Sequence, residues 1–487
     1  MAEVLDNSPP ADLRADARRS PLAELLGLAL PTVAQMASYT VMQFIDTWML
    51  SHYGDADTRV AAPTAAATSG ILAFAVISLG MGALWVVNTL VSQSYGRKEY
   101  AACGRYLWQG VWFGVAFGVV VLPVLPYVGG LFAAAGHKPR LAGLETQYIQ
   151  VVLAASIFKL VGTAFGQFLL AVDRPRQVMA ATVAAVSVNA AASWVLVFGH
   201  FGVKPLGVVG AAWAQNIGVF VEMALLVVFA TRPRVWSQFN VRDWLPRPAM
   251  LRTLLAVGIP SGIQTVADVL AWAAFQMWVM GVFGEKSMAA NTFVFRYMSV
   301  SFMPAYGLSV AVTALVGRYI GRGRPDVAMH RANLGFWVAG AYMVACGLVF
   351  FVGRGALIGI FAVDPDVRRI GAMLLVFAAI YQFFDAMYIV YNGALRGAGD
   401  TLVPALMTAG LCWALTVFGG YAAARWGRMG PAGPWVTATT YGILLGIFML
   451  VRFRRGRWRS IQLDGKPAAD TVPGSMAGGP DAVAPAT

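Results

Sequence analysis

Three aspartates lie inside long apolar stretches of the 487-residue sequence: Asp46, Asp268 and Asp385. A charged side chain at the centre of a bilayer costs about 2.5 to 3.5 kcal/mol on insertion scales, so an acid there is a candidate for function. Arg296 lies in a further apolar stretch and is a potential partner for Asp268 or Asp385. The spacing leaves open whether these carboxylates bind a transported cation or are only paired and neutralised for packing.

Polar and aromatic side chains recur at helical spacing beside each carboxylate. Residues three or four apart share one face of a helix, so each acid is predicted to adjoin a face that meets water or protein, not lipid. These neighbours are Gln35, Tyr39 and Met42 or Gln43 before Asp46, Gln264 and Trp272 around Asp268, and Tyr381, Tyr388 and Asn392 around Asp385.

Three further polar residues also lie within apolar stretches. Asn189 either bonds across helices near Asp46 or satisfies local backbone groups. Lys159 and Glu222 are buried by position, but a lysine can extend to the interface and a glutamate can be protonated. Their spacing leaves a structural role open beside a functional one.

The composition is that of a membrane protein: 58% of residues are apolar, 12% are charged, and the mean hydropathy is +0.65. An ordinary soluble domain carries about 25% charged residues. A transmembrane helix needs about 20 mostly apolar residues. The sequence therefore predicts an all-α integral membrane protein with twelve transmembrane helices, at 24–50, 61–92, 104–133, 141–171, 177–200, 207–230, 251–283, 287–317, 327–353, 367–395, 401–424 and 432–453.

The positive charge is concentrated on alternate loops. With the N-terminus inside, the inner segments carry 23 Lys and Arg residues and the outer loops carry 10. This is the positive-inside pattern, so we expect a multi-pass protein of the cell inner membrane with both termini in the cytoplasm. Residues 1–20 contain no apolar core of a signal peptide, so no cleaved leader is expected. The distribution of the net charge of +13 therefore indicates the orientation of the chain in the membrane, and no nucleic-acid partner is expected.

The helices divide into two halves that read alike. Pro31 and Gln35 recur as Pro260 and Gln264, 229 positions later. An even number of helices per repeat predicts parallel repeats with a central site near the midplane. The predicted divisions are an N-terminal segment (1–20), a first lobe (21–230), a cytoplasmic linker (231–250), a second lobe (251–455) and a disordered tail (456–487).

Several stretches together resemble the multidrug and toxic compound extrusion family, and its NorM-like branch in particular. The likeness covers roughly residues 22–455. It is carried by Phe44-Ile45-Asp46-Thr47, eleven residues after a Pro-x3-Gln start, by Phe377-Ala378-Ala379-Ile380-Tyr381-Gln382, by Asp385-Ala386, and by Gly393-Ala394-Leu395-Arg396-Gly397 with Asp400.

The resemblance implies two six-helix lobes around a central cleft and export of amphipathic, mainly cationic, organic compounds in exchange for H⁺ or Na⁺. It assigns cation coupling to Asp385, Asp268 and Asp46, and a metal site to Asp385 and Asp268 only if the ion is Na⁺. Apart from that ion no cofactor is expected, and the partners are small molecules and the lipid bilayer around a monomer. The implied cleft residues are Gln35, Tyr39, Gln43, Asn189, Gln264, Trp272, Arg296, Tyr381, Tyr388 and Asn392.

Two departures from the family pattern bear on these roles. Ser193 stands where family members often have Asp or Asn, which weakens a proton site built on Asp46 and Asn189. Arg296 stands where a neutral polar residue is expected, so an anionic or zwitterionic substrate is an alternative to a cation.

Other functions fit the sequence less well. The four histidines lack ligand spacing, and Walker and Gly-x-Ser-x-Gly sequences are missing, so we expect an ion gradient as the energy source and no enzyme activity. A major facilitator carrier shares the helix count, but the loop Gln93-Ser94-Tyr95-Gly96-Arg97-Lys98 lacks its Asp-Arg pair. A flippase for lipid-linked saccharide, from the same broad superfamily, stays open because of Arg296 and Lys159.

Overall fold

The computed structural model describes residues 20–134, 136–361, 364–461 and 463. The predicted N-terminal segment and most of the predicted tail lie outside these residues. The described part contains eleven helices long and apolar enough to cross a membrane, or twelve if the bent pair Pro139–Ala154 and Ser156–Ala171 is one span. The all-helical, twelve-span fold class expected from the sequence is thereby confirmed.

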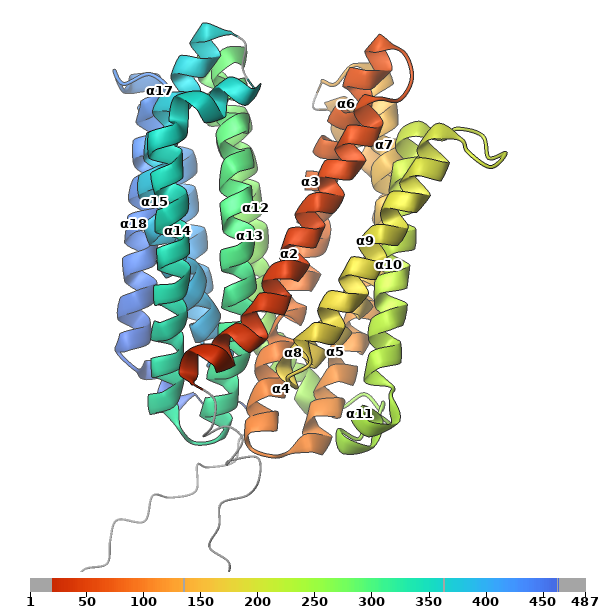
Figure 1. The fold of residues 1–487 in the computed structure, drawn as a ribbon, viewed down its shortest axis with the longest axis vertical. Coiled ribbons are helices and arrows are strands. Elements are labelled where there is room, and N and C mark those ends of the chain that lie inside the picture. The colour runs from red at the N-terminus through yellow and green to blue at the C-terminus, as the bar shows by residue number, and fades with distance from the viewer. Residues whose placement is uncertain (1–19, 135, 362–363, 462, 464–487) are drawn as a thin grey trace, which may run out of the picture.

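The first bundle holds the helices of the N-terminal half (Figure 1, red to yellow-green). One predicted span is broken near Trp85, and another bends by 46° at Ala155. Its elements are α2 (Pro21–Ser51), α3 (Ala56–Leu84), α4 (Val86–Gly96), α5 (Tyr100–Val121), η1 (Leu122–Tyr127), α6 (Val128–Ala134), α7 (Pro139–Ala154), α8 (Ser156–Ala171), α9 (Pro175–Phe198) and α10 (Gly207–Ala230).

The second bundle holds the C-terminal half (Figure 1, green to blue), and π-helical segments interrupt two of its spans. Its elements are α12 (Pro248–Ala274), η2 (Phe275–Val279), η3 (Met280–Phe283), α13 (Glu285–Gly321), α14 (Pro325–Phe361), α15 (Pro365–Gly397), α16 (Leu402–Leu411), η4 (Cys412–Gly419), α17 (Gly420–Trp426), α18 (Ala432–Arg454) and η5 (Arg457–Ser460).

Proline sets the start of many of these helices. A proline at the first helical position has the helical φ and lacks an N–H that would otherwise have no partner in the helix. It occupies that position at Pro21, Pro139, Pro175, Pro233, Pro248, Pro325 and Pro365. Apart from Pro233, where no helix was predicted, these starts lie within a few residues of the predicted ones.

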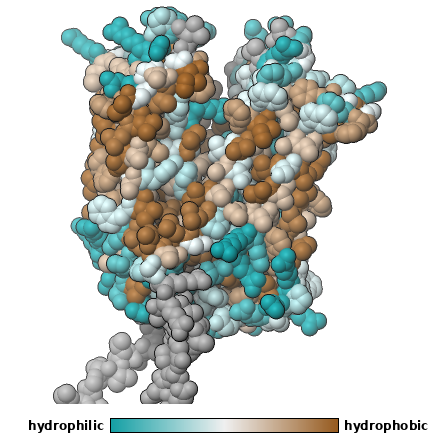
Figure 2. Space-filling model, viewed as in Figure 1, coloured by the Kyte–Doolittle hydropathy of each residue, from teal (hydrophilic) through white to brown (hydrophobic). Residues whose placement is uncertain are grey.

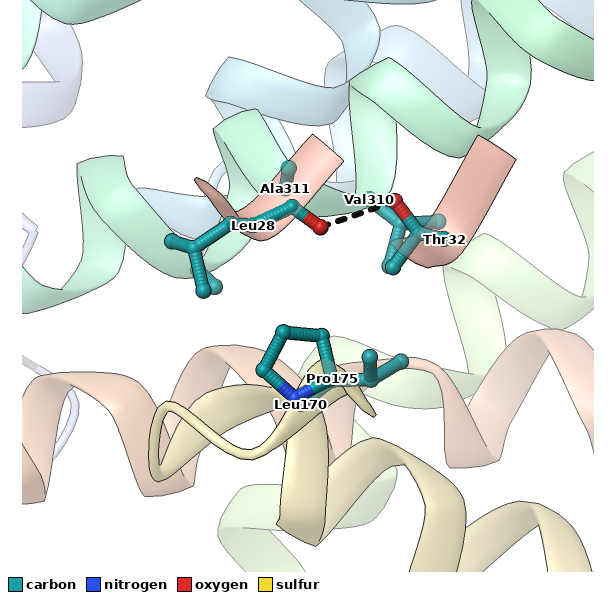
Figure 3. A pocket seen from close by; sticks show the side chains of 7 residues that line it. Leu28, Thr32, Leu170, Pro175, Val310 and Ala311 are labelled. Atoms are coloured by element: carbon teal, nitrogen blue, oxygen red, sulfur yellow. Dashed lines mark hydrogen bonds between the residues drawn. The ribbon is translucent and has the colours of Figure 1, made fainter. Parts of the chain in front are cut away.

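The bundles meet at one end, where α2 begins, and close packing there depends on glycine. A Cβ on Gly307 of α13 would lie 2.9 Å from the backbone of Val33, and one on Gly96 would lie 2.1 Å from the carbonyl oxygen of Arg318. The Thr32 hydroxyl donates to the Gly307 carbonyl at 2.8 Å. At this junction lies a small apolar pocket among α2, α8, α9 and α13 (Figure 3), lined by Leu28, Thr32, Leu170, Pro175, Val310, Ala311 and Ala314.

At the opposite end the bundles diverge. Figure 1 shows α2 and α3 leaning away from α12 and α13, and Figure 2 shows a notch between the bundles on that side. The closed end also carries α11 (Pro233–Gln238) and the linker, which is tied to α5 by the Trp108 indole N–H, a donor to the Val241 carbonyl at 2.7 Å. The two bundles are therefore packed together at one end and separated at the other.

Candidate functional site

Asp268 and Asp385 form the centre of a site inside the second bundle. Asp268 lies on α12 and Asp385 on α15, and the two carboxylates are close enough to interact electrostatically. Asp385 is 6% exposed, and among the described residues no side chain forms a hydrogen bond or ion pair with it. Asp268 is half-buried. Two carboxylates in such a place without a cationic partner repel each other when both are ionised, so a cation or a proton would stabilise the pair.

Gln264 connects the helices around this pair. Its side-chain amide donates to the Thr408 hydroxyl at 3.0 Å, the Tyr388 hydroxyl at 3.3 Å and the Asn392 amide oxygen at 3.4 Å. These partners come from α15 and α16, so one glutamine on α12 holds three helices in register. The predicted neighbours Gln264, Tyr388 and Asn392 are therefore brought together by direct contacts.

Two residues that the sequence did not single out contact Asp268. The Cys412 thiol lies 3.7 Å from the carboxylate, and the Tyr441 hydroxyl lies 3.4 Å from it. Cys412 begins the π-helix η4, and such irregularities often occur at functional sites. Neither residue lies near Asp268 in the chain, so only helix packing could reveal the contact.

An aromatic wall adjoins the carboxylates. The predicted residues Trp272 and Tyr381 pack edge to face with ring centroids 6.2 Å apart, and Trp272 also packs edge to face against Tyr441 at 6.4 Å. Edge-to-face packing of this kind fixes ring orientation and contributes about 0.5 to 1.5 kcal/mol per pair. The wall limits the solvent around Asp268 and Asp385 and offers apolar surface beside them.

Asp46 lies in a separate site inside the first bundle. The Asn189 amide donates to both of its oxygens, at 3.0 and 3.2 Å, and the Ser193 hydroxyl donates to one at 3.0 Å. The expected link between Asn189 and Asp46 is present. Ser193, which stands where family members often have Asp or Asn, contacts the carboxylate from one turn along α9, and the expectation that it weakens a proton site here stays a prediction.

Tyr39, Lys159 and Glu222 form a second polar cluster in the first bundle. The Lys159 ammonium lies 3.6 Å from the Glu222 carboxylate and 4.9 Å from the centroid of the Tyr39 ring. The hydroxyls of Tyr39 and Thr182 both donate to the other Glu222 oxygen, Thr182 at 2.7 Å. Gln35, one turn before Tyr39, is buried, and its amide oxygen has no partner among the described residues.

Arg296 does not pair with Asp268 or Asp385. It is exposed, and the described residues supply no carboxylate oxygen within the 4.0 Å limit of an ion pair. Arg296 lies about three helical turns before Gly307, so it shares the face of α13 that packs on α2 at the closed end. The pairing of Arg296 with Asp268 or Asp385, which the sequence left open, is therefore not found among the described residues. Gln43 of α2 is likewise exposed and forms no side-chain hydrogen bond with Asp46.

The second-bundle site contains oxygen ligands of the kind that reversible cation binding requires. No group of three or more His, Cys, Asp or Glu side chains in the described part of the chain could hold a metal ion. Carboxylate, amide and hydroxyl oxygens are nonetheless ligands that hard cations accept, and Asp268, Asp385 and Asn392 supply them. The same carboxylates can instead carry a proton, which needs no further ligand.

A single family model, MatE, matches the chain twice, over residues 31–195 and 260–421. The two matches begin 229 positions apart, the same spacing that relates Pro31 to Pro260. Together they cover more than half of the chain and leave out the linker.

Proteins similar along most of their length are named as multidrug resistance proteins. The probable multidrug resistance protein NorM of Thermotoga maritima is 27% identical, over 89% of this chain and 92% of its own. The multidrug resistance protein PmpM of Pseudomonas aeruginosa is 27% identical, over 94% of this chain and 96% of its own.

Solved structures match the fold at lower identity. An outward-facing MATE family transporter of the MOP superfamily superposes with a TM-score of 0.82 at 17% identity, over 90% of this chain and 96% of that one. The eukaryotic MATE transporter AtDTX14 gives a TM-score of 0.80 at 18% identity, with the same shares covered.

Proposed function

We propose, because this chain belongs to the multidrug and toxic compound extrusion (MatE) family of transporters, that it is a secondary active antiporter exporting amphipathic organic compounds in exchange for H⁺ or Na⁺. The single observation that carries the proposal is the pair of buried Asp385 and half-buried Asp268, which lie within one bundle and have no cationic partner among the described residues. The multidrug resistance proteins to which it is similar support the class of cargo.

Competition for the same carboxylates provides the coupling. When the ion binds at Asp268 and Asp385 from the outside, a cationic compound held there loses its counter-charge and leaves. Binding of one ligand must weaken the other by the same factor, so the exchange needs no separate relay. Inward movement of each positive charge is driven by about 2.3 kcal/mol per 100 mV of membrane potential.

The surroundings of the pair suit an amphipathic ligand. Trp272, Tyr381 and Tyr441 present ring faces and edges beside the acids, and a cation over an aromatic ring gains about 0.5 to 2 kcal/mol. Gln264 keeps Tyr388 and Asn392 in fixed positions at the rim of the site. The apolar body of a compound can therefore rest on the aromatic wall while its charge meets a carboxylate.

The test is efflux of a cationic dye from proteoliposomes under an imposed Na⁺ gradient or an imposed pH gradient. Wild-type protein is expected to follow one of the two gradients, and Asp385→Asn or Asp268→Asn is expected to abolish that dependence. Asp366→Asn is the matched control, because this acid of the same helix α15 is exposed and pairs with Lys286 at 2.5 Å.

Efflux that ignores both gradients, or no efflux of any dye, would overturn the antiport proposal. It would favour the flippase for lipid-linked saccharide, which would then be tested by translocation of a labelled lipid-linked sugar. A gradient dependence that survives both substitutions would overturn the assignment of the site while leaving antiport in place.

A further inference from the structure

The polar cluster of the first bundle occupies the place that corresponds to the acidic site of the second. The spacing of 229 that relates Pro31 to Pro260 and Gln35 to Gln264 also relates Tyr39 to Asp268. Asp173 lies just after helix α8 and Asp400 just after helix α15, and the two correspond at a spacing of 227. At the same spacing Lys159 corresponds to Ala386, which is next to Asp385 in the chain. Where the second bundle has a pair of acids, the first has a phenol and an ammonium.

Side chains from four helices converge on this cluster. Tyr39 comes from α2, Lys159 from α8, Thr182 from α9 and Glu222 from α10. Both hydroxyls donate to one Glu222 oxygen, and the ammonium faces the other at 3.6 Å. Glu222 therefore accepts two hydrogen bonds from hydroxyls and forms an ion pair with the ammonium.

Apart from Lys159, every polar atom here is an oxygen of a type that binds monovalent cations. The cluster offers a carboxylate, a phenol oxygen and a threonine hydroxyl, and the unpartnered amide oxygen of Gln35 lies one helical turn before Tyr39 on the same side of α2. Hard cations prefer such oxygen ligands. The lysine ammonium is itself a compact, strongly hydrated point charge, and its side chain is 26% exposed against 9% for Glu222.

We propose that this cluster is a monovalent-cation site that the protein fills with its own Lys159 ammonium. The lysine occupies the position of a bound ion in the first bundle, while the corresponding site in the second bundle is left to exchange its cation with solution. In the wild-type protein Na⁺ is excluded from the first-bundle cluster. Removal of the ammonium opens the cluster to Na⁺, because Glu222 then needs another counter-charge.

This inference concerns stability of the first bundle and does not rest on the coupling proposed for Asp268 and Asp385. The experiment measures thermal unfolding of purified full-length protein in NaCl and in N-methyl-D-glucamine chloride of equal ionic strength. The variants are wild type, Lys159→Met, and Lys159→Met with Glu222→Gln. Methionine keeps the length of the lysine stem, and the double variant removes both charges of the pair.

Lys159→Met is expected to be destabilised in the organic salt and to gain at least about 3 °C more from NaCl than wild type does, since ligand binding to the folded state raises the unfolding temperature. The double variant is expected to respond to Na⁺ no more than wild type does. Any Na⁺ response from the second-bundle site is common to all three proteins and cancels in the comparison.

Equal Na⁺ responses in the three proteins would overturn the inference and leave Lys159 and Glu222 as an ion pair that only supports packing. The same conclusion follows if Lys159→Met folds in neither salt while the double variant folds in both, because Na⁺ then fails to replace the ammonium. Neither result depends on transport, so this inference and the antiport proposal can fail separately.

Discussion

The acids within the membrane-spanning helices have different partners in the two bundles. In the second bundle Asp268 and Asp385 lie close together, and no described cation neutralises them. In the first bundle Asp46 is held by an amide and a hydroxyl, and Glu222 is held by Lys159. A shared helical framework therefore supports one site whose acids have no cationic partner among the described residues, which we propose exchanges a cation, and one whose acids have partners. The repeat preserves backbone features such as Pro31 and Pro260, while the polar residues have diverged.

The largest expected effect is the loss of dye efflux when Asp385 is neutralised, and the comparison is neutralisation of Asp46 in the first bundle. Asp385→Asn is expected to reduce gradient-driven dye efflux by more than about tenfold, equivalent to about 1.4 kcal/mol, because no neighbouring donor stabilises its charge. Asp46→Asn is expected to cost less, because Asn189 and Ser193 already satisfy that carboxylate. Initial efflux rates from proteoliposomes measure both. An equal loss in the two variants would remove the proposed difference between the bundles.

The corresponding glutamines provide a second comparison. Gln264→Leu removes three hydrogen bonds among α12, α15 and α16 and is expected to lower stability by about 2 kcal/mol, at about 0.5 to 1.5 kcal/mol per bond. Gln35→Leu is expected to be nearly neutral, because its side chain forms no hydrogen bond with another described residue. Thermal unfolding in detergent measures both, and a larger loss for Gln35→Leu would contradict the contrast.

A smaller effect is expected from Ser193→Ala. This change removes one of the three hydrogen bonds on Asp46 and leaves the two from Asn189, so stability is expected to fall by about 1 kcal/mol. Ser187→Ala is the matched control, because that exposed serine of α9 donates only to the Val183 carbonyl at 2.9 Å. Unfolding temperatures of the two variants measure the difference. If they agree, the Ser193 contact contributes nothing to the fold.

The smallest effect on cation efflux is expected from Arg296→Gln. An exposed charge without a partner contributes at most about 1 kcal/mol, so efflux of a cationic dye is expected to change by no more than about threefold, and upward, because the variant removes a repelling charge. The same proteoliposome assay measures it. A loss as large as that of Asp385→Asn would mean that Arg296 acts with the acidic site after all.

The membrane-spanning helices could be predicted with little error because their signals are local. Runs of apolar residues predicted all the spans, and prolines marked many helix starts. The breaks were not predicted: the interruption at Trp85, the bend at Ala155 and the π-helices after Ala274 and Leu411 leave no clear mark in hydropathy. Composition averages over these irregularities, which depend on how neighbouring helices pack.

The candidate site was predicted in part. Helical spacing placed Gln264 beside Asp268, and Tyr388 and Asn392 beside Asp385, because those relations stay within one helix. Cys412 and Tyr441 were missed, because they reach Asp268 from helices far along the chain. The pairing of Arg296 with Asp268 or Asp385 was left open by the sequence, because spacing along one helix does not say which side chains of another helix lie within reach.

The sequence by itself determined that this chain is a twelve-span, duplicated membrane protein, that acids lie within its spans, and that it resembles one transporter family. These properties follow from hydropathy, charge distribution and short-range spacing, which are independent of how the helices pack. Only the tertiary structure decided which acids have partners, because burial and hydrogen bonding depend on contacts between helices. Asp385 therefore has no hydrogen-bond or ion-pair partner among the described residues. Glu222, which also lies within an apolar stretch of the sequence, forms an ion pair with Lys159.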